Sequence, residues 1–351
     1  MSASHLPLLL AACAGFLLSC GSERTPVRPV GEPVEIAAPF GLPAVPFPAA
    51  NPPTAEAIEL GRRLFFEPAL SADGTISCAS CHRPEHGFAD PRALSKGVGG
   101  QDGARNTPTV LNAVYFERQF HDGRAASLEE QVEGPVTSPV EMAQTRAGAV
   151  ERIAATHDYQ TGFQRVFGPG PVTFEKIAAV IASFERTLVS GDSPFDRFYF
   201  GRDPAALSEE ARRGWEVFRL PEKGNCAVCH LVGARAALFT DHLFHNLGVG
   251  IDADGDLTDL GRSNITGREA DRGAFKTPSL RNVALTAPYM HDGSLKTLRE
   301  VIDFYAVGGR PNPGLDPEIK PLLLNEQDRR DLVAFLESLT GTMPAGSTPS
   351  R

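Results

Sequence analysis

Two short cysteine motifs constrain the fold of this 351-residue chain more than any other feature. The motifs read "CASCH" and "CAVCH", and they supply Cys78, Cys81, His82, Cys226, Cys229 and His230. Cys-x-x-Cys-His is the pattern of c-type haem attachment. The spacing follows from the chemistry, because two thiols must bond the vinyl groups on one edge of a porphyrin while the adjacent histidine ligates the iron. We therefore expect two covalently bound haem c groups, with the chain folded around them.

The N-terminus has the form of an export signal that ends near residue 20. Residues 6–18 are almost wholly apolar, yet they are too few to span a bilayer as a helix. "LLSC", ending at Cys20, resembles a lipoprotein cleavage box and precedes polar residues, whereas "LAAC", ending at Cys13, precedes further apolar ones. We expect a periplasmic protein that is tethered to the membrane by a lipid on Cys20. Simple cleavage to a free periplasmic protein is the alternative.

Two other interpretations of the four motif cysteines are weaker. A thioredoxin-like dithiol does not need a histidine after each pair, and the surrounding sequence lacks the βαβ pattern of that fold. A zinc site would have to gather ligands from motifs that lie far apart in an exported chain. The six cysteines of the chain are these four and the two near the N-terminus, so we favour haem.

One segment of the chain occurs twice as an internal repeat. "NTPTVLNAVYFERQFHDGRAASLEEQV" and "KTPSLRNVALTAPYMHDGSLKTLREVI" align without a gap at a constant offset of 170 residues, so that His121 corresponds to His291. Each copy follows a haem motif, and each motif follows an amphipathic stretch, at residues 60–66 and 212–218. The second copy lies farther from its motif, and we expect the excess in the Asp/Gly-rich residues 248–267. The duplicated unit is therefore a haem domain.

The repeat predicts a mainly α fold of two tandem cytochrome c-like haem domains with long loops, because strand-like alternation is scarce. We expect the N-terminal domain at residues 54–205 and the C-terminal domain at residues 206–341. Residues 21–53 are rich in proline and predict an extended tether, and residues 342–351 predict a flexible tail. The formal net charge of −9 argues against nucleic acid as a partner.

Three longer stretches, together with the two haem motifs, carry a resemblance to a known family. "RNTPTVLNA", "HDGRAASLEEQVEGPVTSPVEM" and "FKTPSLRNVALTAPYMHDGSLKTL" resemble the bacterial di-haem cytochrome c peroxidases, and within that family the MauG-type members. The resemblance covers about residues 54–341. It implies that the N-terminal haem reacts with hydrogen peroxide. It also implies that the C-terminal haem passes on electrons from a small periplasmic donor, a cytochrome c or a copper protein.

The resemblance assigns three residues to the distal side of the N-terminal haem: Gln131, Pro135 and Glu141. Splitting an O–O bond needs a base for the proton of the near oxygen and an acid for the far oxygen, and a buried Glu141 can serve as both. Other members cap this haem at rest with a histidine eight residues before the asparagine of the "RNTP" stretch. That position is Val98 here, and His86 lies too near the proximal motif to ligate. We therefore expect this iron to be permanently open.

On the C-terminal haem the resemblance implies a different sixth ligand. Other members place a methionine fourteen residues after the second HDG histidine, and this chain has Tyr305 there, as MauG-type members do. A phenolate favours Fe(III) and higher states, whereas a thioether favours Fe(II). At the 170-residue offset, Tyr305 corresponds to Pro135. One element of the scaffold is thus expected to fill one iron and to leave the other vacant.

The resemblance also implies one calcium ion between the haems, held by the side chain of Asn106 and the carbonyls of Thr286 and Pro288. His121 stands where the family has a tryptophan between the haems, so the route of inter-haem charge transfer is open. We expect His291 to lie between the second haem and the domain interface. The stretch "DADGDLTD" lacks the glycine and the final glutamate of an EF-hand, and we expect a solvated loop there.

Three functions are consistent with these residues. The first is a di-haem peroxidase that reduces hydrogen peroxide at the N-terminal haem. The second is MauG-type oxidation of side chains in a partner protein, which Tyr305 and Val98 favour. Against it, "KGNCAVCH" has Gly224 and Asn225 where MauG has a surface tryptophan. The third is a non-enzymatic di-haem electron carrier, in which both irons would be six-coordinate.

Overall fold

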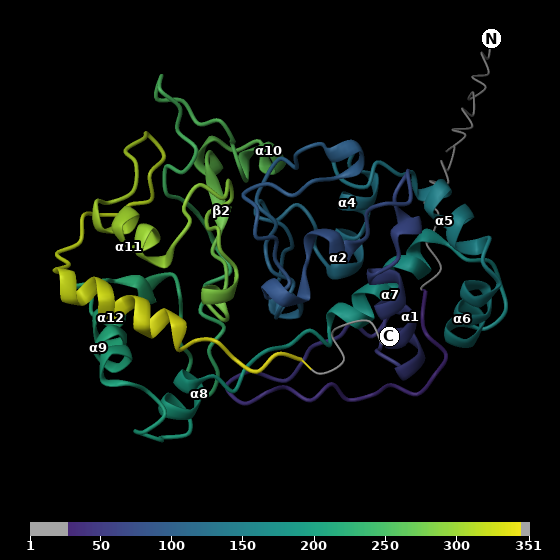
Figure 1. Cartoon of the computed structure of the whole chain (residues 1–351), viewed down its shortest axis with the longest axis horizontal. Helices are drawn as coiled ribbons and strands as arrows, with labels where there is room; N and C mark the ends of the chain where they lie inside the picture. The colour runs from purple at the N-terminus through teal and green to yellow at the C-terminus, as the bar shows by residue number, and fades with distance from the viewer. Residues whose placement is uncertain (1–26, 345–351) are drawn as a thin grey trace, which may run out of the picture.

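A computed structural model describes residues 27–344, and within them the chain is mainly helical (Figure 1). The expected export signal and Cys20 lie outside the described residues. The helices of the N-terminal half are α1 (Ala55–Phe65), α2 (Cys78–Cys81), α3 (Leu128–Gln131), α4 (Glu133–Thr137), α5 (Arg146–Ala154), α6 (His157–Phe167) and α7 (Phe174–Glu185). Those of the C-terminal half are α8 (Pro194–Tyr199), α9 (Glu209–Arg219), α10 (Ser263–Thr266), α11 (Leu298–Ala306) and α12 (Glu326–Glu337).

The described strands form one small antiparallel pair, β1 (Phe244–Asn246) and β2 (Ala274–Lys276). Phe244 pairs with Lys276 and Asn246 with Ala274. The residues between the strands form the long excursion that distinguishes the second copy of the repeat. Its tip, a turn closed by a bridge between Ile251 and Leu257, projects from the body of the molecule (Figure 1).

Each half is built around a crossing of its first long helix with its last. In the N-terminal half α1 crosses α7, and in the C-terminal half α9 crosses α12. A Cβ on Gly61 would lie 1.7 Å from the carbonyl oxygen of Val180, and one on Gly214 would lie 1.9 Å from that of Asp331. Only glycine allows helix backbones to approach this closely. Each crossing therefore depends on its own glycine, Gly61 in α1 and Gly214 in α9.

Two apolar cores correspond to the two halves. The first surrounds Phe65, Phe88 and Phe184, and the second surrounds Phe218 and Phe335. Trp215, the only tryptophan of the chain, lies in the second core as expected. Phe195 of α8 also packs there, so this core includes residues that precede the boundary expected at 205/206.

The proline-rich segment differs from the expected tether over its described part. Residues 27–53 lie along both halves as a strap, visible in purple in Figure 1. Val30 N–H donates to Val166 O (2.8 Å), and the Asn51 side chain donates to Ala179 O (2.9 Å) in the N-terminal half. In the C-terminal half, Arg281 Nη2 donates to Gly41 O (2.7 Å). The strap thus donates through Val30 and Asn51 and accepts through Gly41, because an extended proline-rich backbone leaves its remaining N–H and C=O groups free for partners outside the segment.

The expected flexible tail also begins in ordered contacts. Thr342 N–H donates to Gly191 O (2.8 Å), and Met343 packs against the first core. Residues 345–351 lie outside the described part of the chain. Within residues 27–344, no helix combines the length and the apolar character that crossing a bilayer requires.

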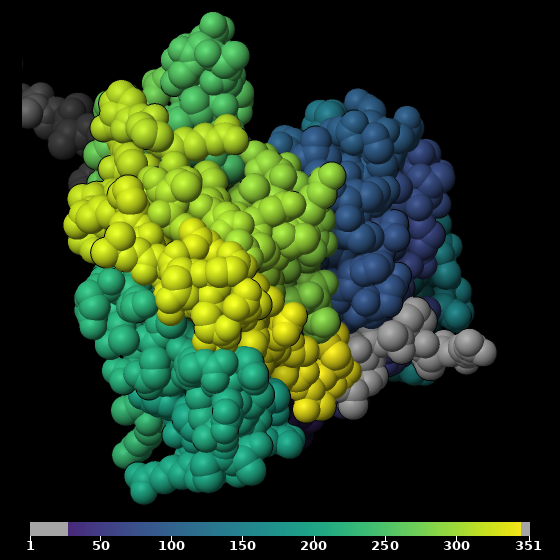
Figure 2. Space-filling model, turned by 60° about the vertical axis from the view of Figure 1, so that its left-hand side comes forward, coloured from purple at the N-terminus to yellow at the C-terminus, as the bar shows by residue number. Residues whose placement is uncertain are grey.

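The two halves meet through the repeated segments, which lie against each other in Figure 2. Lys276 N–H donates to His121 O (2.7 Å), and Asn106 N–H donates to His291 O (2.8 Å). At the 170-residue offset, Lys276 corresponds to Asn106 and His121 corresponds to His291. The second bond is therefore the first with the two halves exchanged. The interface therefore has an approximate two-fold symmetry that follows from the repeat.

The excursion of the second copy adds a clamp without a counterpart in the first. Arg105 binds Asp259 through Nε (2.7 Å) and Nη2 (3.0 Å), and its Nη1 contacts Asp122 (2.6 Å). Arg262 Nη1 donates to the carbonyls of Asp122 (2.8 Å) and Gly123 (2.9 Å). The extra residues thus grip the His-Asp-Gly turn of the N-terminal half. The expected solvated loop is found for residues 252–256, which are exposed, but not for Asp259.

Candidate active site

Both motif histidines are held in the orientation that an iron ligand needs. Nδ1 of His82 lies 3.2 Å from Phe88 O, and Nδ1 of His230 lies 2.8 Å from Phe239 O. Because a carbonyl only accepts, Nδ1 carries the proton and Nε2 keeps its lone pair for a metal. Burial lowers the pKa of both rings, which favours the neutral form that ligates.

The two carbonyls that orient these histidines share an unusual backbone conformation. Phe88 has φ = 58° and Phe239 has φ = 53°. A bulky residue in the left-handed region is uncommon, and such conformations persist where the surrounding structure imposes them. Both side chains are fully buried, so the packing of each core fixes the turn that directs its carbonyl at the histidine.

The motif cysteines fit covalent attachment of a haem. All four thiols are free and half-buried, and burial raises the pKa of Cys226 to about 12. In the C-terminal half, Cys226, Cys229 and His230 line an apolar cavity of about 290 Å³. A cavity that carries both thiols and the histidine on its wall matches the shape and the chemistry of a c-type haem site.

Tyr305 lies on the wall of the same cavity, in α11. Its hydroxyl is buried, and burial raises the pKa of the phenol, with a further contribution from Cys226 and Cys229. The structure thus brings together the expected proximal and distal residues of the C-terminal haem. A neutral phenol in such a place ionises only when a positive group such as a ferric iron stabilises the phenolate.

In the N-terminal half the matching helical segment is interrupted only at Val132, whose φ (−55°) and ψ (−34°) stay helical. Where α11 is continuous, α3 ends at Gln131 and α4 carries Pro135, with Val132 between them. Glu141 follows in a turn that folds back, so that Met142 N–H donates to Pro135 O (3.1 Å). Burial raises the pKa of the Cys81 thiol, and the charge of the Glu141 carboxylate raises it further.

Glu141 has the environment of a proton-transfer group. Burial raises the pKa of its carboxyl above the ordinary value, against a hydrogen bond from Ser138 and the charge of Arg124. Val98 N–H donates to Glu141 O (2.8 Å), so the loop that carries Val98 is tied to this residue. A Cβ on Gly97 would lie 2.5 Å from the same oxygen, and the loop therefore packs directly on the Glu141 backbone.

The residues expected to hold calcium lie on one wall of the cavity: Asn106, Thr286 and Pro288. Asn106 Nδ2 donates to the carbonyls of Arg92 and Ala93, both at 3.1 Å, which turns Oδ1 the other way. Among the described residues, no donor is hydrogen-bonded to Asn106 Oδ1 or to the carbonyls of Thr286 and Pro288. Three oxygens without hydrogen-bond donors are suitable ligands for a hard cation such as calcium.

Of the two repeated histidines, His291 is buried and His121 is partly buried. His121 Nε2 lies 2.9 Å from Asn106 O, so this nitrogen carries the proton. Burial lowers the pKa of His121 to about 4, against that hydrogen bond. The His291 ring stacks on Phe275 with centroids 3.6 Å apart. His121, His291 and Phe275 all line the C-terminal cavity, so a neutral imidazole occupies the place expected for a tryptophan.

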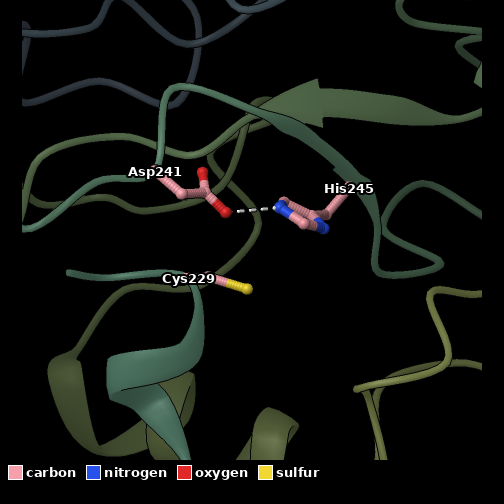
Figure 3. Close-up of side chains that lie close together, drawn as sticks. All are labelled: Cys229, Asp241 and His245. Atoms are coloured by element: carbon pink, nitrogen blue, oxygen red, sulfur yellow. Dashed lines mark hydrogen bonds and ion pairs between the residues drawn. The ribbon is translucent and has the colours of Figure 1, made fainter.

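A second histidine cluster was not predicted from the sequence. His245 lies with Asp241 beside Cys229 (Figure 3), and its ring nitrogens contact Asp241 Oδ2 (2.9 Å) and Asp316 Oδ2 (2.6 Å). The hydrogen bond with the Cys229 sulfur, followed by those with Asp316 and Asp241, raises the pKa of His245 to about 10. Haem attachment turns this sulfur into a thioether, so we do not assign a metal to the cluster.

The N-terminal half also buries polar groups that sequence reasoning missed. Glu185 ends α7, and burial raises its pKa to about 8. Its Oε2 and two nitrogens of Arg186 are buried without hydrogen-bond partners, although Arg186 Nη2 pairs with Glu129 (2.8 Å). Buried polar atoms are nearly always satisfied in complete structures, so these orphans indicate a domain that encloses a further group. Sequence reasoning missed Glu185 and Arg186 because they stand at the end of the apolar helix α7, where charged residues are ordinarily exposed.

Comparisons with known proteins agree with this geometry. Residues 55–204 match the family model described as "Di-haem cytochrome c peroxidase", and residues 211–340 match "Cytochrome c". The methylamine utilization protein MauG of Methylorubrum extorquens is 42% identical over 309 residues, which cover 87% of this chain and 84% of that protein. The chain belongs to the di-haem cytochrome c peroxidase family.

Further members extend the comparison. The cytochrome c551 peroxidase of Nitrosomonas europaea is 38% identical, over 88% of this chain and 86% of that protein. Among solved structures, a MauG-like protein associated with microbial copper homeostasis superposes with a TM-score of 0.77 at 35% identity, covering 86% of this chain and 94% of that one. The di-haem peroxidase BthA of Burkholderia thailandensis gives 0.72 at 28% identity, covering 90% and 95%.

Family membership confirms several predictions made from the sequence. The fold is mainly α with two tandem cytochrome c-like domains, the protein is a haem peroxidase by class, and its two domains imply two c-type haems. The roles of individual site residues, the calcium ion and the lipid anchor are not decided by family membership.

Proposed function

We propose that this protein reduces hydrogen peroxide at its N-terminal haem with electrons that pass through its C-terminal haem. The reaction consumes two electrons and two protons for each peroxide and yields two waters. The observation that carries the proposal is the difference between the two copies: Tyr305 of α11 lines the C-terminal cavity, while the corresponding residue of the first copy is Pro135 of α4, whose side chain cannot ligate iron. A pair of sites that differ in this way suits one open iron and one closed iron.

The haem would supply an iron that binds peroxide and exchanges electrons. The chain supplies the protons. Glu141, with its raised pKa, would take the proton from the near oxygen and deliver it to the far one. Gln131 would hold the peroxide by a hydrogen bond, and Pro135 would keep the sixth position free of a ligating side chain. Val98 cannot ligate iron, so the oxidised protein would need no prior reduction.

Calcium belongs to the same proposal. The free oxygens of Asn106, Thr286 and Pro288 would hold one ion between the halves. His121 would bridge the halves as a neutral hydrogen-bond donor. The donor of electrons would be a small periplasmic cytochrome c or copper protein, and the protein would work in the periplasm, anchored by lipid at Cys20.

A second candidate is the MauG-type oxidation of a partner protein. Tyr305 in the cavity and the absence of a histidine at Val98 favour it, and the MauG of Methylorubrum extorquens is 42% identical. Gly224 and Asn225 weaken the transfer of that protein's substrate, because neither side chain can relay an oxidising equivalent at the surface.

Rapid mixing of the fully oxidised protein with stoichiometric peroxide separates these functions. We expect an immediate change in the haem absorption spectrum. If the change then disappears rapidly with a reduced cytochrome c, the protein is a peroxidase; if it persists for minutes, the MauG-type function is favoured. A response only after one-electron reduction would contradict the open N-terminal iron. No response in either state would leave an electron carrier.

A further inference from the structure

The approximate two-fold symmetry of the interface extends to the segments that contact Lys276. Gln119 corresponds to Tyr289 at the 170-residue offset. Gln119 N–H bonds Ala125 O (2.9 Å), and Tyr289 N–H bonds Leu295 O (2.7 Å). Their side chains match in one bond, because Gln119 Nε2 donates to Ala113 O and Tyr289 Oη donates to Val283 O, both at 3.1 Å, while Gln119 Nε2 also donates to Phe116 O (3.2 Å). The two loops are therefore structural equivalents.

This symmetry gives each expected calcium ligand an equivalent residue in the other copy of the repeat. Asn106 corresponds to Lys276, Thr286 to Phe116, and Pro288 to Arg118. The backbone N–H groups of Asn106 and Lys276 make the reciprocal bonds across the interface. The equivalent position of the proposed calcium site is therefore lined by the Phe116 and Arg118 residues of the N-terminal half and by the side chain of Lys276.

The Lys276 side chain already places a cation at this equivalent position. Nζ donates to Arg118 O (2.8 Å), the carbonyl that corresponds to that of Pro288. It also lies 3.8 Å from the centre of the Phe116 ring, within the range of a cation–π contact. Lys276 belongs to the C-terminal half, and its ammonium donates to a carbonyl of the N-terminal half. The Arg118 carbonyl thus has a positively charged partner without a bound metal.

We propose that the repeat generates two cation sites between the halves, and that the ammonium of Lys276 fills the second. The inference rests on the proposed calcium site at Asn106, which it completes. The first site takes a divalent metal through a neutral side-chain oxygen. The second replaces that oxygen with a tethered positive charge, so it needs no ion. The chemical class of its ligand, once the lysine is removed, is a hard divalent cation such as calcium.

Electrostatics are compatible with this role. Burial lowers the pKa of Lys276 to about 7, and the Asp122 carboxylate acts against that shift. The ring of Phe116 favours the protonated form, because only a cation is attracted by its face. Asp122 itself is paired with Arg105 (2.6 Å) and Arg124 (2.9 Å), so it lies near the ammonium without taking it from Arg118.

The test converts the second site into a copy of the first. In the haem-loaded full chain, Lys276→Asn restores the residue found at the corresponding position 106. Calcium per chain is counted by atomic emission after dialysis against a fixed calcium concentration. We expect Lys276→Asn to bind one calcium more than the wild type, and calcium to raise its thermal midpoint more. Lys296→Asn, an exposed substitution of the same kind, should match the wild type.

Two further variants keep the result decisive if the asparagine variant matures poorly. Lys276→Met removes the charge and should lower the thermal midpoint by about 3–6 °C, without rescue by calcium. Lys276→Arg keeps a cation in the site and should recover most of that loss. No extra calcium in Lys276→Asn, or equal midpoints in the Met and Arg variants, would overturn the proposal. If the wild type bound no calcium, the proposed site at Asn106 would be contradicted. The proposal for Lys276 would still be tested, because it depends on the difference in bound calcium between Lys276→Asn and the wild type.

Discussion

At the scale of single residues, the two copies of the repeat differ at the positions that decide chemistry. Tyr305 and Pro135 share one place in the duplicated unit, as do Lys276 and Asn106. A phenol can ligate iron and a proline cannot; an ammonium repels a metal and an amide oxygen binds one. Single substitutions in a duplicated scaffold are therefore sufficient to give each half a different role.

The first prediction concerns Glu141. Glu141→Gln removes the group that takes and returns the proton, so the rate of peroxide cleavage should fall by about two orders of magnitude or more. Stopped-flow absorption at fixed peroxide measures this rate. Glu151→Gln, an exposed glutamate of α5, is the matched control and should leave it unchanged. Near-normal cleavage in Glu141→Gln would remove this residue from the mechanism.

The pH dependence of the same rate follows from the raised pKa of Glu141. The base form exists only above that pKa, so the rate should fall as the pH falls through it. Because the pKa is raised, this fall should begin at a higher pH than for an ordinary glutamate. The Glu141→Gln variant should lack this limb of the pH–rate profile. A wild-type rate that is flat across the acidic range would contradict the assignment.

The second prediction concerns Tyr305. Tyr305→Met should raise the midpoint potential of the C-terminal haem by on the order of a few hundred mV, since a thioether stabilises Fe(II) more than a phenolate does. Spectroelectrochemical titration measures the potential. Tyr305→Phe separates loss of the hydroxyl from gain of the sulfur, and it should open the sixth position. An unchanged spectrum and potential in both variants would show that Tyr305 does not ligate.

At the scale of elements, the fold is set by helix crossings and by one interrupted helix. The Gly61 and Gly214 crossings bring α1 onto α7 and α9 onto α12, and these pairs frame the two haem sites. The helix that carries Tyr305 is continuous, whereas its counterpart divides into α3 and α4. Pro135 lies in α4, and the turn that follows α4 leads to Glu141.

The third prediction tests one crossing. Gly214→Ala places a Cβ 1.9 Å from the Asp331 carbonyl oxygen, which is backbone and cannot rotate away. The helices must separate, and we expect a loss of about 2 kcal/mol or more in the free energy of unfolding. Denaturant unfolding of the haem-loaded protein measures it. Gly162→Ala, in α6, meets only the end of the Leu60 side chain and should cost less than about 1 kcal/mol or stabilise slightly.

At the scale of the whole molecule, the halves are joined by three distinct devices. The repeated segments exchange backbone hydrogen bonds, the excursion of the second copy clamps the first His-Asp-Gly turn, and the strap of residues 27–53 crosses both halves. The strap is fixed in the C-terminal half by Arg281, which also pairs with the fully buried Asp196 (2.8 Å). The haem sites are therefore held at a fixed separation.

The fourth prediction tests the clamp. Asp259→Asn removes one partner of Arg105 from a largely buried pair, and we expect the halves to lose about 1–3 kcal/mol of mutual stabilisation. Differential scanning calorimetry should then resolve two unfolding transitions where the wild type shows one. Asp254→Asn changes the same charge in the exposed turn of the same excursion and should leave the trace unchanged. A single unshifted transition in Asp259→Asn would exclude a structural role for the clamp.

The sequence by itself determined the haem motifs, the duplication and the mainly α class. Attachment needs two thiols and a histidine within five consecutive residues, and a repeat is visible by comparison of the chain with itself, so both are local information. The helical stretches expected at residues 60–66 and 212–218 overlap α1 and α9 for the same reason. The roles assigned to Gln131, Glu141 and Tyr305 came from resemblance to a family, since a single glutamine, glutamate or tyrosine, taken alone, has no pattern that marks it as functional.

Only the tertiary structure decided which distant groups meet. The strap was taken for a tether because contacts such as those of Val30 N–H and the Gly41 carbonyl use backbone groups, which leave no trace in residue type. The contacts of Lys276 with Arg118 and of Arg105 with Asp259 join residues more than 150 positions apart, and each partner alone is an ordinary charged residue. Such contacts depend on how two packed domains dock, and this is fixed by the shape of their surfaces rather than by any local pattern.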